Sequence, residues 1–367
     1  MLYVPTRLPE QILKARYSRF QELLRKSEVD AVMLRTLSSF KYFAGVKWLR
    51  PALLIPAEGE PIAFVARGEE DLFRERTWIG SIATYADGGE LMGKVSRTIR
   101  ELKFRRVGLE FGIERDSYIL FYEMFKRLNP QVEVVDVSQL IFQLRMVKET
   151  VELDMIRRAG RIAAKVVEDV LSRVKMGMSE TDIAAEAYYE LYRSGCEEPH
   201  VLVNVGPEPR VHSEPFKDVV VKEGVFVTMV VAADYNGYYA NVTRTKYMGE
   251  AGGVAGRALE CMNVVFEQAR NLTKAGVRFI DVMKTLDKTY AEYGFLEHRV
   301  AGYAHGIGLQ VEEPPITTIV PAHRMMDVKP GMAIALVHAP LLLKGLGQVK
   351  MEDTFIVRED GSLEKIT

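Results

Sequence analysis

Histidines and carboxylates are residue types that can do chemistry, and we consider first two histidines and one glutamate of this chain. His212 ends a Pro-Arg-Val-His segment, His305 lies in Ala-His-Gly-Ile-Gly-Leu, and Glu352 lies in Val-Lys-Met-Glu-Asp-Thr. A histidine titrates near neutral pH and can act as a general acid or base without a metal ion. A carboxylate can hold a cationic substrate, and a buried carboxylate needs partners. We therefore expect His212 and Glu352 to face a shared pocket and to act as catalytic residues, with His305 as the third candidate.

Each of these residues also has a structural interpretation. A single histidine in a protein core is more often a packing residue than a catalyst, and the glycines around His305 can be required by backbone geometry alone. Tyr238 and Tyr239 are ordinary strand-forming residues. Ionisable groups with perturbed pKa values can be purely structural.

The stretch from Val225 to Thr245 is the central element. Its first part alternates and then runs apolar, as a buried strand does. Asp-Tyr-Asn-Gly at 234–237 is a turn signal with Asn-Gly at its centre, and residues 238–245 have the pattern of a returning strand. This pattern predicts a β-hairpin.

The first 140 residues alternate helical and strand patterns, which predicts an α/β domain. Helices are expected at Gln11–Lys26, Leu91–Leu102 and Ser117–Leu128. Strands are expected at Asp30–Leu34, Ser81–Tyr85, Arg106–Glu110 and Val132–Val137, with two more inside Phe40–Val65 joined by a turn at Glu58-Gly59. No glycine-rich phosphate loop is present, so we expect no nucleotide site.

The rest of the chain predicts an α+β domain that begins after a boundary near Ser138–Lys148. Helices are expected at Val151–Val174, from Ser179 to Gly195 with a capping box to Asp182, near Gly253–Ala275 and at Ile280–Tyr293. Besides the hairpin, strands are expected at His200–Val205, Val300–Leu309, Met332–Val337 and Val349–Val357.

Composition narrows the class of protein. The 367 residues are 48% hydrophobic and carry a formal net charge of −1, so two domains are expected and no nucleic-acid partner is indicated. Only two cysteines are present, which fits a reducing compartment. No segment has the pattern of a signal peptide or the length of a membrane span. We therefore expect a soluble, cytoplasmic protein with no membrane partner.

Several motifs resemble one known family. The hairpin ends in Val-Thr-Arg-Thr at 242–245, Tyr-Phe-Ala-Gly stands at 42–45, and Arg-Met-Val-Lys-Glu-Thr begins at Arg145. With the His305 and Glu352 segments, these motifs resemble the creatinase and Xaa-Pro dipeptidase superfamily of pita-bread hydrolases. The resemblance implies an N-terminal α/β domain at 1–140 and a C-terminal pita-bread domain at 146–367. It also implies a homodimer in which an N-terminal loop, here with Trp48 and Arg50, caps the partner's pocket.

The resemblance places the family's metal ligands on positions that have mostly changed. In the active metallopeptidases two Asp, one His and two Glu hold two divalent ions, which activate a bridging water. Those five positions fall here on Val230, Asn241, His305, Val337 and Glu352. Only one of four carboxylates remains, which leaves about three positive charges of two divalent ions uncompensated in a partly buried pocket. We therefore expect no paired metal site and no cofactor, or at most a single Mn, Co or Zn ion.

Two residues could repair the metal site. Asp234 shares a face with Val230 if the strand stays regular, and a bulge could turn His338 inward beside Val337. The simpler expectation is that Asp234 serves the turn and that His338 points to the opposite face.

The substrate positions of the family have also changed in part. His212 corresponds to a histidine that contacts substrate or moves protons, whereas the position of a second substrate histidine holds Glu312. Lys350 stands where an arginine is usual, and Tyr239 belongs to a Gly-Tyr-Tyr that creatinase shares. Creatinase uses no metal, but it has a glutamate at the position of Thr243, so creatine itself is not expected as the substrate.

Three functions remain open from the sequence. The first is a metal-independent or metal-poor hydrolase of a small amide or amidine that uses His212 and Glu352. The second is an active Xaa-Pro dipeptidase whose metal site is repaired by Asp234 or His338. The third is a binding protein without catalysis that captures a peptide, since the same fold also occurs in peptide-binding modules. Each takes a small-molecule or dipeptide-like ligand.

Overall fold

The computed structural model describes residues 8–112, 117–212 and 214–367. The chain forms two compact units, Met1–Arg145 and Met146–Thr367, which are considered separately below. In the described part of the chain no helix combines the length and the apolar character that crossing a membrane requires.

The first unit is built on a six-stranded sheet in the order β4-β3-β2-β1-β5-β6. All neighbouring strands are parallel except that β2 runs antiparallel to both β1 and β3. The strands are β1 Ala31–Leu34, β2 Leu53–Pro56, β3 Ile62–Ala66, β4 Ser81–Tyr85, β5 Arg106–Leu109 and β6 Glu133–Asp136. The helices are α1 Glu10–Lys26, α2 Leu37–Ala44, α3 Glu70–Arg74, α4 Gly88–Glu101, α5 Ser117–Leu128 and α6 Ser138–Met146.

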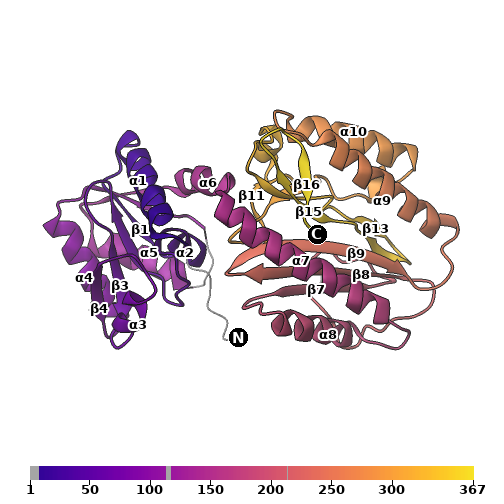
Figure 1. The fold of residues 1–367 in the computed structure, drawn as a ribbon, viewed down its shortest axis with the longest axis horizontal. Helices are drawn as coiled ribbons and strands as arrows, with labels where there is room; N and C mark the ends of the chain where they lie inside the picture. The colour runs from indigo at the N-terminus through magenta and orange to yellow at the C-terminus, as the bar shows by residue number, and fades with distance from the viewer. Residues whose placement is uncertain (1–7, 113–116, 213) are drawn as a thin grey trace. The chain divides into compact units, whose positions relative to one another are not determined.

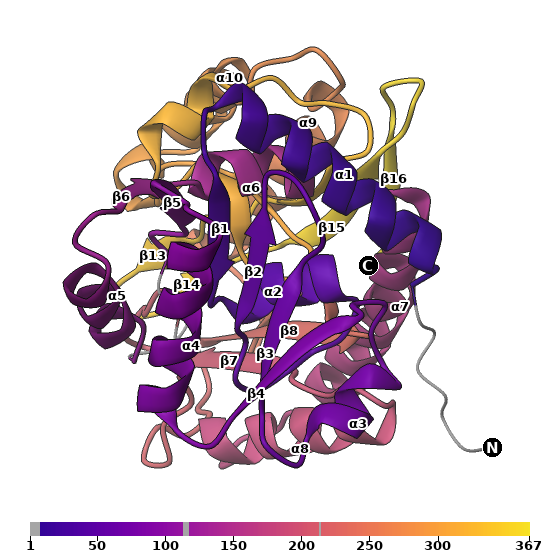
Figure 2. The same ribbon diagram turned by 90° about the vertical axis from the view of Figure 1, so that its left-hand side faces the viewer.

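Helices cover both faces of this sheet. Figure 2 shows α4 and α5 to one side of strands β1 to β4 and α1 to the other. The apolar stripe of α4, which includes Val95 and Ile99, packs with Phe121 and Phe125 of α5 on Phe64 of the sheet. The predicted α/β organisation is therefore correct for this unit.

Helix α2 was not predicted. Two strands were expected within Phe40–Val65 and no helix, but Leu37–Ala44 is helical. Phe40 and Phe43 lie three residues apart, and Phe43 stacks on Phe20 of α1 with ring centroids 4.8 Å apart. The helix ends at Gly45, whose φ of 76° is the left-handed conformation that glycine adopts easily after a helix.

The second unit contains three sheets and two helix pairs. The sheets have the strand orders β7-β8-β9, β11-β10-β12-β15-β16 and β13-β14. In Figure 1, α7 and α8 lie against the first sheet, while α9 and α10 lie on the far side of the unit. The helices are α7 Thr150–Arg173, α8 Glu180–Arg193, α9 Gly253–Leu272 and α10 Phe279–Glu292, with short 3₁₀ segments η1 Leu296–His298 and η2 Pro321–Met325.

The strands of this unit agree closely with the predicted hairpin. They agree less closely with the strands predicted after residue 299. They are β7 His200–Val205, β8 Phe226–Tyr235, β9 Tyr238–Tyr247, β10 Ala304–Gly306, β11 Glu313–Ile316, β12 Ala333–Leu336, β13 Leu341–Leu343, β14 Gly347–Val349, β15 Asp353–Val357 and β16 Leu363–Lys365. The predicted strand at Val300–Leu309 is reduced to β10. The predicted strand at Val349–Val357 is interrupted at 350–352, and this interruption positions two residues of the site described below.

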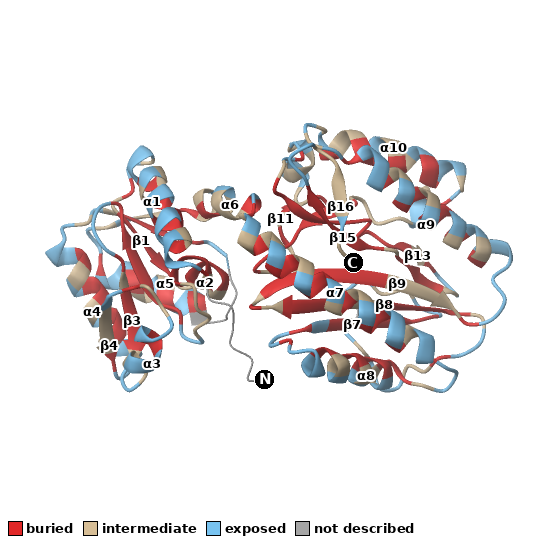
Figure 3. Cartoon of the chain, in the orientation of Figure 1, coloured by how far each residue is buried: buried red, intermediate tan, exposed pale blue. Residues whose placement is uncertain are grey.

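Local sequence signals explain how the helices begin. Ser179 and Asp182 form the predicted capping box of α8, in which Ser179 Oγ accepts from the Asp182 amide and Asp182 accepts from the Ser179 amide at 2.8 Å. Helix α7 uses Glu149 and Glu152 in the same way. Such reciprocal bonds satisfy backbone N–H groups that a helix start leaves unpaired. In Figure 3, β8 and β9 are mostly red, that is, buried, whereas α7 and α8 carry exposed residues among buried ones.

Candidate functional site

The two faces of the central hairpin have different neighbours. Val227 and Met229 of β8 belong to the apolar core beneath α7 and α8. Because side chains alternate along a strand, Val230 lies on the opposite face, where it pairs with Thr243 of β9. Thr243 forms an isolated antiparallel bridge with Glu352, with 3.0 Å from the Thr243 nitrogen to the Glu352 carbonyl. The inner face of the hairpin therefore meets the segment between β14 and β15.

The Glu352 carboxylate is completely buried and has four partners. Thr243 Oγ1 donates to Oε2 at 2.7 Å, and the Lys350 ammonium lies 2.9 Å from the same oxygen. His305 Nε2 and His338 Nδ1 lie 3.3 Å and 3.2 Å from Oε1. Burial alone would raise the pKa of Glu352, but Lys350 and the two histidines hold it well below its ordinary value. Glu352 is therefore a fixed anion whose charge is compensated by the chain itself.

The two histidines beside Glu352 have opposite electrostatic environments. Burial would lower the pKa of His305, but its hydrogen bond to Glu352 and the Glu352 charge outweigh burial and raise it. Burial together with Lys350 and His305 lowers the pKa of His338 to about 4. The rings of the two histidines meet edge to face with centroids 4.6 Å apart. His338 is consequently a neutral imidazole at physiological pH, whereas the pKa of His305 is shifted in the opposite direction.

A bulge after β12 brings His338 into the site. The amides of Val337 and His338 both donate to the Tyr303 carbonyl, at 2.6 Å and 3.1 Å, and Val337 has a φ of 61°. Two residues facing one partner is the pattern of a β-bulge, which re-aims the side chains that follow it. The expectation that His338 points away from the site was wrong, because strict strand alternation ends at Leu336.

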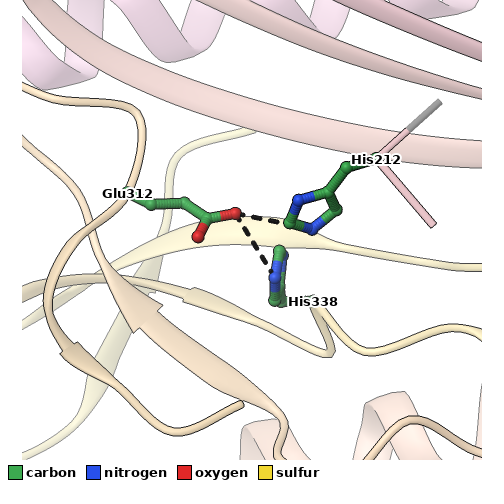
Figure 4. A group of neighbouring side chains, drawn as sticks. All are labelled: His212, Glu312 and His338. Atoms are coloured by element: carbon green, nitrogen blue, oxygen red, sulfur yellow. Dashed lines mark ion pairs between the residues drawn. The ribbon is translucent and has the colours of Figure 1, made fainter. Parts of the chain in front are cut away.

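A second group of ionisable side chains, drawn in Figure 4, consists of His212, Glu312 and His338. Glu312 Oε1 lies 3.4 Å from His338 Nε2 and 3.6 Å from His212 Nε2. The side chain of His338 is 5% exposed, that of Glu312 28% and that of His212 50%. Burial would raise the pKa of Glu312, but His305, His338 and His212 together lower it. The sequence analysis named Glu312 and His338 without placing them together.

His212 and Glu352 do not touch each other. They are joined through Glu312 and His338, so a chain of ionisable groups runs from a half-exposed imidazole to a fully buried carboxylate. His212 has a φ of 50°, a conformation that non-glycine residues seldom adopt and that is concentrated at functional sites.

Other residues named from the sequence have structural partners instead. The Asp234 carboxylate accepts from the amides of Glu197 and Glu198, each at 3.0 Å, so it holds the segment before β7 and does not join the groups above. Tyr239 Oη donates to the Glu198 carbonyl at 3.0 Å. In the first unit, Trp48 Nε1 donates to Glu69 Oε2 at 3.0 Å.

The residues present do not fit a pair of divalent ions. At the mapped positions, Val230 and Val337 offer no ligand atom, and the Asn241 side-chain oxygen accepts from Thr354 Oγ1 at 3.2 Å. The remaining carboxylate, Glu352, already faces the Lys350 ammonium at 2.9 Å. Groups of at least three close ligand atoms occur among the described residues at His305–His338–Glu352 and at His212–Glu312–His338. Neither group has the carboxylates that two divalent ions require.

Comparison with known families agrees with the fold. Residues 154–359, more than half of the chain, match the model of metallopeptidase family M24. The chain belongs to metallopeptidase family M24. Residues 16–147 match the creatinase/prolidase N-terminal domain. The predicted family, with an N-terminal α/β domain before a pita-bread domain, is therefore confirmed.

Individual relatives of this M24 protein resemble it over nearly their whole length. A Xaa-Pro dipeptidase from Pyrococcus furiosus is 22% identical over 352 residues, which cover 95% of this chain and 97% of the relative. The crystal structure of the prolidase from Pyrococcus horikoshii matches with a TM-score of 0.86 at 22% identity, covering 96% of this chain and 98% of that one. A Xaa-Pro dipeptidase structure from Bacillus anthracis gives a TM-score of 0.84 at 23% identity, covering 97% of each chain.

Proposed function

We propose that this M24 protein hydrolyses a carbon–nitrogen bond in a small amide or amidine without a pair of metal ions. The observation that carries the proposal is the Lys350 ammonium, which lies 2.9 Å from Glu352, the one carboxylate left at the mapped metal positions. It supplies from the chain itself the positive charge that a buried carboxylate needs. The half-exposed His212 beside Glu312 is then the group available for proton transfer.

His212 acts as general base and then as general acid in this proposal. It takes a proton from a water molecule whose oxygen adds to the carbon of the carbon–nitrogen bond. It returns the proton to the nitrogen as that bond breaks, so water is consumed and an amine is released. Glu312, 3.6 Å from His212 Nε2, stabilises the imidazolium that forms between the two steps. His338 connects Glu312 with the fixed Glu352 anion and so holds the arrangement in place.

The test measures turnover of a panel of small amides, amidines and Xaa-Pro dipeptides. Turnover is monitored by the release of amine, in the presence of a chelator. We expect turnover to persist with the chelator and to fall about 100-fold or more in His212→Ala, which is the contribution general acid–base catalysis usually makes. His298→Ala, in the 3₁₀ segment η1, is the matched control and should leave turnover unchanged. Undiminished turnover in His212→Ala contradicts the assignment, and binding without turnover favours a non-catalytic binding protein.

One observation favours a second candidate, a metal-dependent dipeptidase with a single ion. If Nδ1 of neutral His338 donates to Glu352, its Nε2 presents a lone pair to Glu312 Oε1 at 3.4 Å. Two acceptors facing each other need a cation between them, and ligand atoms of a tetrahedral zinc site lie about 3.4 Å apart. His212, Glu312 and His338 would be the ligands, and Glu352 would orient His338 from behind, as carboxylates do at metal-bound histidines.

Metal analysis separates this candidate from the first. The single-ion dipeptidase predicts one tightly bound Mn, Co or Zn per chain, loss of Xaa-Pro dipeptide turnover with chelator, and loss of the ion in Glu312→Gln. Glu297→Gln, on η1, is the control and should retain the ion. Two ions per chain would contradict both candidates and restore the dinuclear mechanism.

A further inference from the structure

A cavity of about 420 Å³ is lined by residues of the first unit. Arg35 and Thr36 follow strand β1, and Ala86 and Asp87 follow strand β4. Because β2 runs opposite to its neighbours, the residues just before it, including Arg50, share this edge of the sheet. Open α/β sheets bind ligands outside the carboxyl ends of their parallel strands, so the cavity occupies the expected position for a ligand.

Arg35 is the residue that defines the chemistry of the cavity. Its guanidinium stacks on the ring of Phe121 at 4.7 Å, and its Nη1 is buried without a hydrogen-bond partner among the described residues. Burial lowers the pKa of Arg35, and the neighbouring groups that oppose this change are the phenols of Tyr85 and Tyr118. A partly buried guanidinium whose Nη1 has no carboxylate partner among the described residues is costly, so an anion in the cavity would supply the missing partner.

A second buried polar group points to the same conclusion. Tyr118, which lines the cavity, is 8% exposed, and its hydroxyl has no hydrogen-bond partner in the described part of the chain. Arg50 adds another guanidinium to the wall. Helix α4 begins at the cavity with Gly88, and the positive end of a helix favours negative charge.

The acidic residues close to the cavity have other partners. Asp87 accepts from the Glu90 amide at 2.8 Å as the cap of α4. Glu110 accepts from Ser39 Oγ at 2.7 Å and from the hydroxyl of Thr36, which lines the cavity. These bonds engage the carboxylates and leave the guanidinium of Arg35 facing the cavity.

We propose that this cavity binds a small organic anion whose carboxylate or phosphate head faces Arg35 and Tyr118. Leu49, Pro51 and Leu91 supply apolar walls for the body of the ligand. Arg50 takes part here as a direct contact to the anion, a role different from capping a partner's pocket. The proposal uses residues of the first unit alone and is independent of the hydrolase proposed above.

Calorimetric titration of the full chain tests the proposal with three probes. Inorganic phosphate and benzoate represent the two head groups, and benzylammonium is the control with the opposite charge. We expect an anion to bind and benzylammonium to fail. Tighter binding of benzoate assigns a carboxylate head, and tighter binding of phosphate assigns a phosphorylated ligand.

Substitutions at the cavity test whether the anion binds beside Arg35 and Tyr118. Arg35→Gln and Tyr118→Phe should each weaken the bound anion about tenfold, the effect of losing one hydrogen bond to a charged group. Tyr118→Phe removes only a hydroxyl without a described partner, so it should fold normally. Arg67→Gln, at a side chain that is 66% exposed and outside the cavity, is the matched control and should bind as the parent does. Absence of anion binding, or equal binding by the parent and Tyr118→Phe, overturns the proposal.

Discussion

At the scale of single residues, the site is governed by how one buried negative charge is balanced. Glu352 has an ammonium, a hydroxyl and two imidazoles around it, all supplied by this chain. Moving a carboxylate out of water is unfavourable unless it is paired and hydrogen-bonded. Lys350 is therefore a stabilising partner first, and its charge also keeps the neighbouring His338 neutral.

Replacing Lys350 by Met tests this role. We expect the free energy of unfolding to fall by about 3 kcal/mol, since removing one member of a buried ion pair leaves the other uncompensated. Urea denaturation of the parent and the variant measures the difference. Lys350→Arg keeps the charge and should lose less stability than Lys350→Met. Equal stability of the parent and Lys350→Met would mean that His305 alone balances Glu352.

At the scale of elements, short irregular segments carry the site and regular strands support it. Glu352 and Lys350 lie in the interruption between β14 and β15, and Glu312 lies just before β11. The loop of Glu312 is anchored by its neighbour Glu313, which forms a buried ion pair with Lys148 at 2.7 Å. Gly308 permits this pair, because a Cβ there would lie 2.6 Å from Glu313 Oε1.

Breaking the buried Lys148–Glu313 pair should lower the free energy of unfolding far more than breaking a surface ion pair. The side chains of Lys148 and Glu313 are 2% and 4% exposed, whereas Lys284 and Asp281 are 67% and 41% exposed. We expect Lys148→Met to lower the free energy of unfolding by about 3 kcal/mol. Lys284→Met, the same substitution at the exposed pair, should cost about 0.5 kcal/mol or less. Denaturant titration of both variants measures this contrast, and similar losses would refute the anchoring role.

The sequence predicted the regular elements better than these irregular segments. The Asn-Gly turn and the alternation of β8 predicted the hairpin, and the Ser179 capping box predicted the start of α8, because these signals are local. Helix α2 was missed because its aromatic residues match a strand pattern equally well and only packing on α1 decides between them. The position of His338 depends on the Tyr303 carbonyl, which lies far away in the sequence.

At the scale of the second unit, the first helix and the last strand are tied together. Arg157 of α7 makes two hydrogen bonds to Glu364 of β16, at 2.8 Å and 2.9 Å. Such a paired arrangement is the stronger form of an arginine–carboxylate contact. The hydrogen bond from Arg157 lowers the pKa of Glu364 despite partial burial. The tie therefore stabilises the unit only while Glu364 is ionised.

The pH dependence of unfolding tests this tie. A carboxyl group whose pKa is lowered on folding contributes stability above its unfolded pKa of about 4.3, and this contribution is lost as the pH falls through the folded value. We expect Glu364→Gln to be less stable than the parent by about 1 kcal/mol at neutral pH. The difference should vanish at the acid end of a urea titration series. A difference that does not change with pH would show that packing, not charge, is lost.

The bulge at Val337 affects how this protein is compared with its relatives. Counted along the sequence from Gly331-Met332, the position of the family's metal-binding glutamate falls on Val337, which suggests a lost ligand. In space, the neighbouring His338 delivers an imidazole nitrogen 3.2 Å from Glu352. Counting the substituted ligand positions therefore understates the number of polar groups that lie around Glu352 in this M24 protein.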